Sequence, residues 1–421
     1  MRKFGPWGSG IMALGLALSV AACGGSTAPA SSPSRPVAPS SAAGHSNSPY
    51  VVHVVLGLTG QAATLAQAEK TSLELFVKRY NQQGGLDGHP VQLSIQDDEN
   101  NPKVSVPLMQ QLFAQHVPFV IGPTLGETAA PDAAIFAQGP TVEYALTPAF
   151  PPPAFGSYVF SAAMSFGSAA QATLNYIESK GWTQVAFLNS TDTTGKTADM
   201  AFQAALKLPQ YQNLHVVQWQ HFSVNAVSVA TQMSVIAQAH PQVLVSFATG
   251  TPLGLVLQGI ANTGFKAPVI TDDGNMTYAE FDQFHDIPPG GLYVASGAWN
   301  AASVLPPGPE KTADETFLQT MQAGHVRPDL GDAIPWDVIT LLLDAVKHYG
   351  LNATGAQIHQ YIEQLTNFPG AMGVFDFTRN TPDARQRGLS TSSAFIYQWM
   401  PQQQQWVPVS KAGGAALSPQ G

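Results

Sequence analysis

Apolar and polar positions along this chain follow two alternating periods. Short β-branched runs, of which VVHVVLGL at 51–58 is the clearest, are typical of buried strands. Between these runs, other stretches carry apolar residues at helical spacing. Over the first third of the chain we expect strands at 51–58, 89–99, 117–123 and 140–146, and helices at 67–82, 103–115 and 128–138. A strand followed by a helix, repeated in this way, predicts a parallel sheet with right-handed crossovers.

The same pattern begins again near 160–167 and continues through the second part of the chain. This repetition predicts an α/β protein with two similar lobes, each a parallel sheet flanked by helices. Ligands of such sheets bind beyond the carboxyl ends of the strands, so we expect one cleft in which the ends from both lobes meet. The expected strands are 183–190, 214–222, 242–249, 267–273 and 291–299, and the expected helices are 169–180, 197–207, 227–239, 252–263, 310–323 and 334–349.

The first 49 residues depart from this pattern and predict an exported protein with a lipid anchor. A basic start (MRK) precedes an apolar run at 11–22, which is too short to span a bilayer and is typical of a signal peptide. The run ends in VAAC, which resembles the lipobox of bacterial lipoproteins, so 1–22 is the expected signal peptide and Cys23 the expected lipid anchor. The alternative is an ordinary secretory signal with a chance cysteine. Residues 23–49, rich in Ser, Ala, Pro and Gly, are expected to form a flexible tether.

Composition and charge narrow the class of function. The formal net charge of -9 argues against a nucleic-acid partner. Cys23 is the only cysteine, which excludes an internal disulfide. The folded part, about 360 residues from 50 to 410, is long for one core and favours two domains. Residues 411–421 are expected to form a disordered tail.

Four segments together resemble the branched-chain amino acid binding (leucine-binding) family, the type I solute-binding proteins of ABC importers. Each segment alone is moderately specific, but the segments follow one another in the order that the family has. The likeness therefore extends along the whole folded region. The segments are NQQGGLDGHPVQLSIQDD (81–98), FVIGPTLGETAAP (119–131), DAIPWDVITLL (332–342) and GAMGVFDFTRN (370–380).

The resemblance implies the two-lobed periplasmic-binding-protein type I fold. We assign 50–162 plus 296–372 to lobe 1 and 163–295 plus 373–410 to lobe 2. The resemblance also implies the function: an extracytoplasmic lipoprotein that binds an amino acid, or a similar small polar carboxylate or amide, and delivers it to an ABC transporter permease. We expect a monomer on the outer face of the cell membrane that needs no cofactor and catalyses no reaction.

Two loops of lobe 1 carry candidate ligand-binding residues. At Gly126, Glu127 and Thr128 a strand passes into a helix, and the N–H groups and dipole of a helix start form an anion site that suits a ligand carboxylate. The alternative is a plain turn with a threonine cap. The resemblance implies that the backbone of Ala145 and the hydroxyl and amide of Thr147 grip the amino-acid head of the ligand. The alternative is that Thr147 simply suits its turn.

Lobe 2 offers Thr194, Thr249 and Asp273. The family often has an aromatic residue where Thr194 stands, so this departure leaves room for a ligand other than leucine or valine. Thr249 and Phe247 are expected to line the cleft. A carboxylate near position 273 pairs with the ligand ammonium in the family, and a charge-assisted contact of this kind is worth roughly 1.5–3 kcal/mol. The alternative for Asp273 is a solvated Asp-Asp-Gly turn.

Other patterns in the sequence argue against chemistry at this cleft. STDTTGKT at 190–197 is close to a phosphate-binding loop but has Ser190 in place of the first glycine. The eleven histidines lack metal-ligand spacing, and no Gly-x-Ser-x-Gly elbow is present. We therefore expect no metal, nucleotide or catalytic centre. Two other functions stay open: a sensor partner that binds the ligand and docks on a membrane receptor, and an enzyme that acts in the cleft.

Overall fold

The computed structural model describes residues 47–60, 62–148, 156–282, 284, 286–379 and 382–417, which lie in one compact unit. The predicted signal peptide, Cys23 and most of the predicted tether lie outside the described residues, as does the end of the predicted tail. None of the helices in the described part combines the length and the apolar composition needed to cross a membrane.

Five parallel strands form the first sheet, in the order β2-β1-β3-β4-β5. The four strands predicted for this region are present, each shorter than its apolar run. The fifth strand, β5, is three residues long, which is too short for a period to reveal. The bounds are β1 (Tyr50–Leu56), β2 (Val91–Asp97), β3 (Phe119–Ile121), β4 (Val142–Ala145) and β5 (Val159–Ser161).

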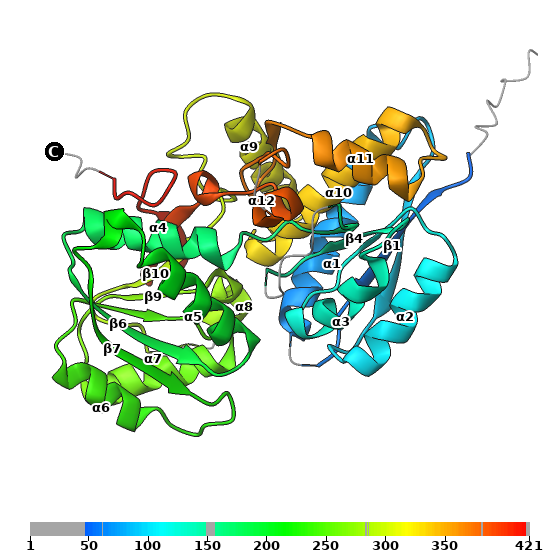
Figure 1. Cartoon of the computed structure of the whole chain (residues 1–421). Helices are drawn as coiled ribbons and strands as arrows, with labels where there is room; N and C mark the ends of the chain where they lie inside the picture. The colour runs from blue at the N-terminus through cyan, green and yellow to red at the C-terminus, as the bar shows by residue number, and fades with distance from the viewer. Residues whose placement is uncertain are drawn as a thin grey trace, which may run out of the picture. The chain divides into compact units, whose positions relative to one another are not determined.

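Helices cover both faces of the first sheet (Figure 1). Adjacent residues of β1 point to opposite faces, so Val54 shares a core with Leu73 of α1, whereas Val55 shares a core with Met109 of α2. Helices α10 and α11 join the core of α1, and α3 joins that of α2. The bounds are α1 (Ala63–Gln82), α2 (Pro102–Ala114), α3 (Gly126–Phe136), α10 (Leu330–Tyr349) and α11 (Gly355–Gln364).

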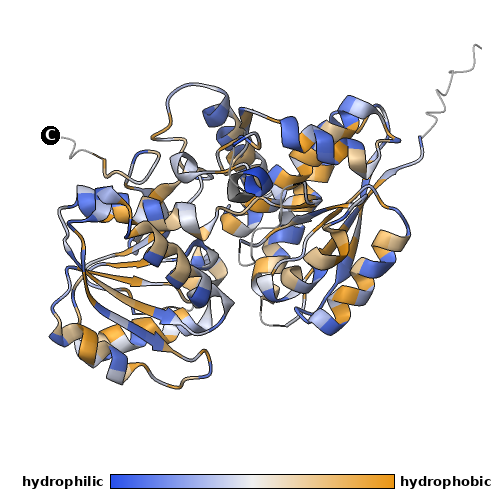
Figure 2. Ribbon diagram, viewed as in Figure 1, coloured by the Kyte–Doolittle hydropathy of each residue, from blue (hydrophilic) through white to orange (hydrophobic). Residues whose placement is uncertain are grey.

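Seven strands form the second sheet, in the order β14-β13-β10-β9-β8-β6-β7. The predicted parallel arrangement is confirmed for the five strands from β6 to β10, and an antiparallel hairpin of β13 and β14 is added beside β10. Figure 2 shows the edge strand β7 as more hydrophilic than β6, in keeping with its greater exposure. The bounds are β6 (Gln184–Ser190), β7 (His215–Phe222), β8 (Val243–Ser246), β9 (Val269–Thr271), β10 (Leu292–Ser296), β13 (Phe395–Met400) and β14 (Gln405–Pro408).

The second sheet also buries both of its faces. Val185 and Phe187 of β6 pack in one core with α4 and α5, whereas Ala186 and Leu188 pack in another with α6 and α7. The short helix α8 follows β9. The bounds are α4 (Phe166–Ser179), α5 (Thr193–Ala205), α6 (Ala230–Gln238), α7 (Thr251–Thr263) and α8 (Tyr278–Phe281).

A buried aspartate in α10 holds the loop between β11 and β12. The two carboxylate oxygens of Asp337 accept the N–H groups of Ala371 and Met372, each at 2.7 Å. A Cβ on Gly370 would lie 2.5 Å from an oxygen of Asp337, so the glycine allows this close approach. The contact joins two of the segments on which the family resemblance depends. The remaining bounds are α9 (Pro309–Ala323), β11 (Phe368–Pro369), β12 (Val374–Phe375) and α12 (Pro382–Arg387). The lobe boundaries stay a prediction.

Candidate functional site

The loops after β3 and β4 lie side by side at the carboxyl edge of the first sheet. The N–H of Gly122 donates to the carbonyl of Tyr144 at 2.9 Å, and the N–H of Leu146 donates to the carbonyl of Pro123 at 3.0 Å. These two bonds extend the pairing of β3 with β4 beyond the strand ends. The loop that leads to Gly126 is therefore next to the loop that carries Ala145 and Thr147.

The first turn of α3 contains three of the predicted residues. Gly126 and Thr128 are buried, whereas Glu127 is exposed. The hydroxyl of Thr128 donates to the carbonyl of Leu125 at 3.0 Å, and no side chain caps this helix start. Thr128 is thus inside the first turn and is not the cap that the alternative interpretation expected. Ligand binding by Gly126, Glu127 and Thr128 stays a prediction.

Thr124 begins the predicted binding loop, and the structure gives it a positioning role that the sequence did not reveal. Its hydroxyl accepts the N–H of Gly57 at 3.3 Å and donates to the carboxyl of Glu69 at 2.6 Å. Burial raises the pKa of Glu69 to about 8, against the opposing effect of the Thr124 bond. Through these contacts α1 and the loop after β1 hold the start of the 124–128 loop. The one sequence signal for this positioning role was a threonine directly after Gly-Pro at the end of a strand.

Arg387 is the second residue that the sequence did not reveal. This arginine at the end of α12 is 3% exposed, and its guanidinium donates to the hydroxyl of Ser161 at 2.9 Å and to the carbonyl of Pro148 at 3.1 Å. The same Ser161 hydroxyl donates to the carbonyl of Thr147 at 2.9 Å. A cation from near the end of the chain therefore holds the loop that carries Thr147.

Asp272 organises the carboxyl edge of the second sheet. Its carboxylate accepts the hydroxyl of Thr249 at 2.9 Å, the N–H of Ala248 at 3.1 Å and the side-chain amide of Asn275 at 3.0 Å. The other end of that amide accepts the N–H of Gly250 at 2.8 Å. The loops after β8 and β9 are therefore joined, with Thr249 at their contact. Burial raises the pKa of Asp272 to about 6.

Asp273 is next to this network and is buried, with 8% of its surface exposed. The alternative interpretation as a solvated turn is therefore wrong. Burial raises the pKa of Asp273 to about 8, and the charge of Asp272 adds to this effect. A cationic partner would stabilise the ionised form of this carboxyl group, because its charge offsets the cost of ionisation in a buried position.

Thr194 lies in the first turn of α5, at the end of β6. The carboxylate of Asp192 caps this helix by accepting the N–H of Gly195 at 3.1 Å, and it also accepts the hydroxyl of Ser190 at 2.6 Å. A Cβ on Gly195 would lie 1.8 Å from the carbonyl oxygen of Ser190, so only glycine fits there. The near match to a phosphate-binding loop is thus accounted for by an aspartate cap and a close helix-to-strand contact.

The structure brings the candidates together in two groups. Thr194, Thr249 and Asp273 follow β6, β8 and β9, which are neighbours in the second sheet. The first-sheet candidates follow β3 and β4, which are neighbours as well. Phe247 does not join either group. It is 1% exposed, and its ring packs against those of Phe166 and Phe202 in the core. The expectation that it lines the cleft is wrong, because its side chain packs in the core between the sheet and helices α4 and α5.

In the part of the chain that the structure describes, no group of three or more His, Cys, Asp or Glu side chains could hold a metal ion.

Comparison with known proteins bears on this arrangement. A family model described as periplasmic binding protein matches residues 49–401. An extracellular ligand-binding receptor from Rhodopseudomonas palustris has a similar structure, with a TM-score of 0.71 at 21% identity over 84% of this chain and 98% of that one. The branched-chain amino acid substrate-binding protein LivJ from Streptococcus pneumoniae, solved in complex with isoleucine, has a TM-score of 0.68 at 15% identity over 86% of this chain and 99% of that one.

One curated relative matches at the sequence level. The Leu/Ile/Val-binding protein BraC3 of Rhizobium johnstonii is 28% identical over 87 residues, which is 21% of this chain and 24% of the relative. The match thus spans about a quarter of that protein's length. The structural neighbours confirm the predicted fold, two parallel-stranded α/β lobes of the periplasmic binding protein type, and the predicted family resemblance is confirmed with it.

Proposed function

Because this chain belongs to the periplasmic binding protein family, we propose that it is the solute-binding lipoprotein of an ABC importer. Its ligand is an amino acid, or a similar small polar carboxylate or amide, held between the two groups of loops at the sheet edges. The observation that carries this proposal is the buried Asp273, beside a carboxylate network that already includes Thr249. The relative named for leucine, isoleucine and valine, and the neighbour that holds isoleucine, support an amino-acid ligand.

Each edge has a separate task in this mechanism. The backbone N–H groups at the start of α3, with Ala145 and Thr147, receive the ligand carboxylate, because a helix start attracts negative charge. Asp273 receives the ammonium group. A ligand that touches both lobes stabilises the closed arrangement over the open one, and this difference in contact free energy drives closure. No bond is made or broken.

The side chain of the ligand meets Thr194. Threonine is smaller than the aromatic residue that the family often places there, so the site accepts a side chain larger or more polar than that of leucine or valine.

Delivery to a permease requires that the protein stay at the membrane, which is the task of the lipid on Cys23. Cys23→Ala should move the protein from the membrane fraction to the soluble fraction. A variant that stays with the membranes rules out the lipid anchor at this cysteine.

The ligand is found by a thermal-shift screen of the purified protein against amino acids, amides, urea, short peptides and aromatic acids. A ligand that binds only the folded state raises the melting temperature, and the stabilisation grows with the logarithm of its concentration over Kd. We expect an amino acid to do so, and isothermal titration calorimetry then gives Kd. If only compounds without an ammonium group bind, Asp273 does not contact the ligand in the proposed way. Hydrolysis or transfer activity toward a bound compound would contradict the transport role.

A further inference from the structure

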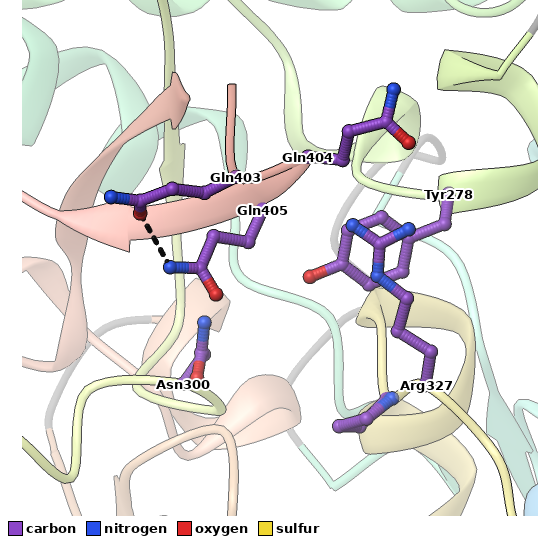
Figure 3. Close-up of a pocket in the computed structure, with 7 residues that line it drawn as sticks. Tyr278, Asn300, Arg327, Gln403, Gln404 and Gln405 are labelled. Atoms are coloured by element: carbon purple, nitrogen blue, oxygen red, sulfur yellow. Dashed lines mark hydrogen bonds between the residues drawn. The ribbon is translucent and has the colours of Figure 1, made fainter. Parts of the chain in front are cut away.

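We propose that this protein has a second binding pocket, in which Arg327 holds the carboxylate of a small organic molecule. The pocket has a volume of about 460 Å³ and is lined by Tyr278, Asn300, Arg327, Pro328 and the turn Gln403–Gln405 (Figure 3). Its walls come from α8, the loop after β10, the segment before α10 and the turn between β13 and β14. None of the residues proposed for the amino-acid site lines this pocket.

Arg327 is the only charged residue in the lining. It forms no ion pair with a carboxylate among the described residues. The nearest acidic neighbour in sequence, Asp329, is 6% exposed, and its carboxylate accepts the N–H groups of Gly331 at 2.9 Å and of Tyr278 at 3.3 Å. Burial raises the pKa of Asp329 to about 7, against the opposing effect of these bonds and of the Arg327 charge. The pocket therefore presents a permanent positive charge in a protein whose net charge is -9.

The guanidinium is held in one orientation. Its central carbon lies 3.4 Å from the centre of the Tyr278 ring, a stacked cation–π contact. Trp399 packs against the same tyrosine, with 6.1 Å between ring centres. Stacking covers a face of the guanidinium, whereas a carboxylate is bound in its plane, through two parallel N–H bonds. The contact with Tyr278 thus leaves the recognition geometry intact and reduces the ordering cost of binding.

Side-chain amides supply the rest of the pocket. The amide nitrogen of Asn300 donates to the carbonyl of Trp406 at 2.9 Å, and that of Gln405 donates to the side-chain oxygen of Gln403 at 2.6 Å. Figure 3 shows the Tyr278 hydroxyl directed toward Asn300 and Gln405, with Arg327 beside the ring. The glutamine run at 402–405, which has no role in the proposed amino-acid site, thus lines a pocket with hydrogen-bonding groups that carry no charge.

These groups select the class of ligand. One guanidinium balances one carboxylate, and neutral amides suit hydroxyl, carbonyl or amide groups on the same molecule. A phosphate is less suited, because its second charge has no cationic partner here and the net charge of the protein repels it. The volume is within the range of small-molecule sites and fits a molecule between an amino acid and a dipeptide in size.

Isothermal titration calorimetry of the purified protein with lactate, pyroglutamate and N-acetylglycine, which carry one carboxylate each beside a hydroxyl or amide group, tests the proposal. These probes carry carboxylates and lack an ammonium group, so they do not satisfy Asp273. We expect at least one probe to bind the wild-type protein and Arg327→Gln to weaken that binding at least tenfold. Arg79→Gln, the same change on α1 outside the pocket, is the matched control and should stay within twofold.

A second variant keeps the stacked pair and changes only the charge. Gln405→Glu places a carboxylate of nearly the same shape in the pocket, and we expect it to weaken the probe at least fivefold with an unchanged melting temperature. The proposal is overturned if no probe binds with a Kd below about 10 mM. Equal affinity of wild type and Arg327→Gln overturns it as well. Either result leaves the amino-acid site untouched, because that site is tested by Asp273 and its own ligand.

Discussion

The carboxyl edges of the two sheets have the same architecture and opposite chemistry. At the first edge, the loops after β3 and β4 offer hydroxyl and backbone groups, and the guanidinium of Arg387 holds the second of these loops. At the second edge, Asp272 and Asp273 follow β9 directly. The first edge thus suits the negative end of a zwitterion and the second suits its positive end. The comparison indicates that the sign of the charge next to the strand ends, more than the fold, assigns a role to each lobe.

Acidic groups near the first edge do not contradict this difference. Asp98, Asp132 and Glu143 are fully buried, and burial raises the pKa of all three, that of Asp132 to about 7. The N–H of Asn100 donates to the carboxyl of Asp98 at 2.8 Å, and this bond opposes the rise at Asp98. Burial thus favours the uncharged form of these carboxyls, which reduces their repulsion of a ligand carboxylate.

Removal of the charge at the second edge gives the largest expected effect. Asp273→Asn keeps the shape of the side chain and should weaken an amine-bearing ligand about 10- to 150-fold, the equivalent of roughly 1.5–3 kcal/mol for a charge-assisted bond. Isothermal titration calorimetry measures the change. Asp282→Asn, an exposed aspartate near the end of α8, is the control and should bind as wild type. Unchanged affinity in Asp273→Asn would show that the two edges do not differ in the proposed way.

The matching change at the first edge is Thr147→Val, which removes one hydroxyl and keeps the volume. We expect at least a tenfold loss of affinity for the same ligand, because a hydrogen bond to an ionised carboxylate is worth roughly 1.5–3 kcal/mol. Thr312→Val on the exposed side of α9 serves as the control. A loss below twofold would mean that Thr147 only shapes its turn.

The pH dependence of binding sharpens the contrast, since Asp273 at the second edge is the titrating group that we propose to pair with the ligand ammonium. The pKa of Asp273 is about 8 without ligand, as a result of burial and of the neighbouring Asp272 charge. Acid protonates this carboxyl and removes the partner of the ammonium group, so affinity should fall as pH falls. From pH 8 to pH 7 the expected decrease is about fivefold. The profile is measured by calorimetry in buffers of different ionisation enthalpy, and it should be flat in Asp273→Asn. A flat wild-type profile argues against an ionised Asp273 in the complex.

The smallest effect concerns stability at the first edge. Burial raises the pKa of Glu69 to about 8 in the folded state, above the value near 4.3 of an unfolded chain. The contribution of Glu69 to stability is therefore complete below about pH 4 and is lost as pH rises toward 8. We expect a higher melting temperature at pH 5 than at pH 8, and a smaller difference in Glu69→Gln. A difference as large in Glu69→Gln as in wild type would assign the pH dependence to other buried carboxyls.

The strand-end candidates were accessible from the sequence because their strands have clear apolar periods. The runs before Gly126, Ala145, Thr249 and Asp273 predict strands, and a parallel sheet places the residues that follow them on one edge. Thr124 and Arg387 were missed for a physical reason. Arg387 meets Ser161 across 226 positions of the chain, and no local period records such a contact. The β13–β14 hairpin was missed because it lies beyond residue 349, where the last predicted helix ends and the alternation of strand and helix periods stops.

The α/β class, the order of most strands and helices between 50 and 349, and the residues that follow the predicted strands could be read from the sequence, because all three depend on local periodicity and chain connectivity. Which of these residues are buried, and which groups face them, became visible only in the folded structure. The sequence left a solvated turn open as the alternative for Asp273, yet this residue is only 8% exposed and lies beside a second carboxyl. Phe247 looks like a cleft residue, yet it packs in the core. Burial and charge pairing arise from segments that are distant in the chain, so they appear only after the chain has folded.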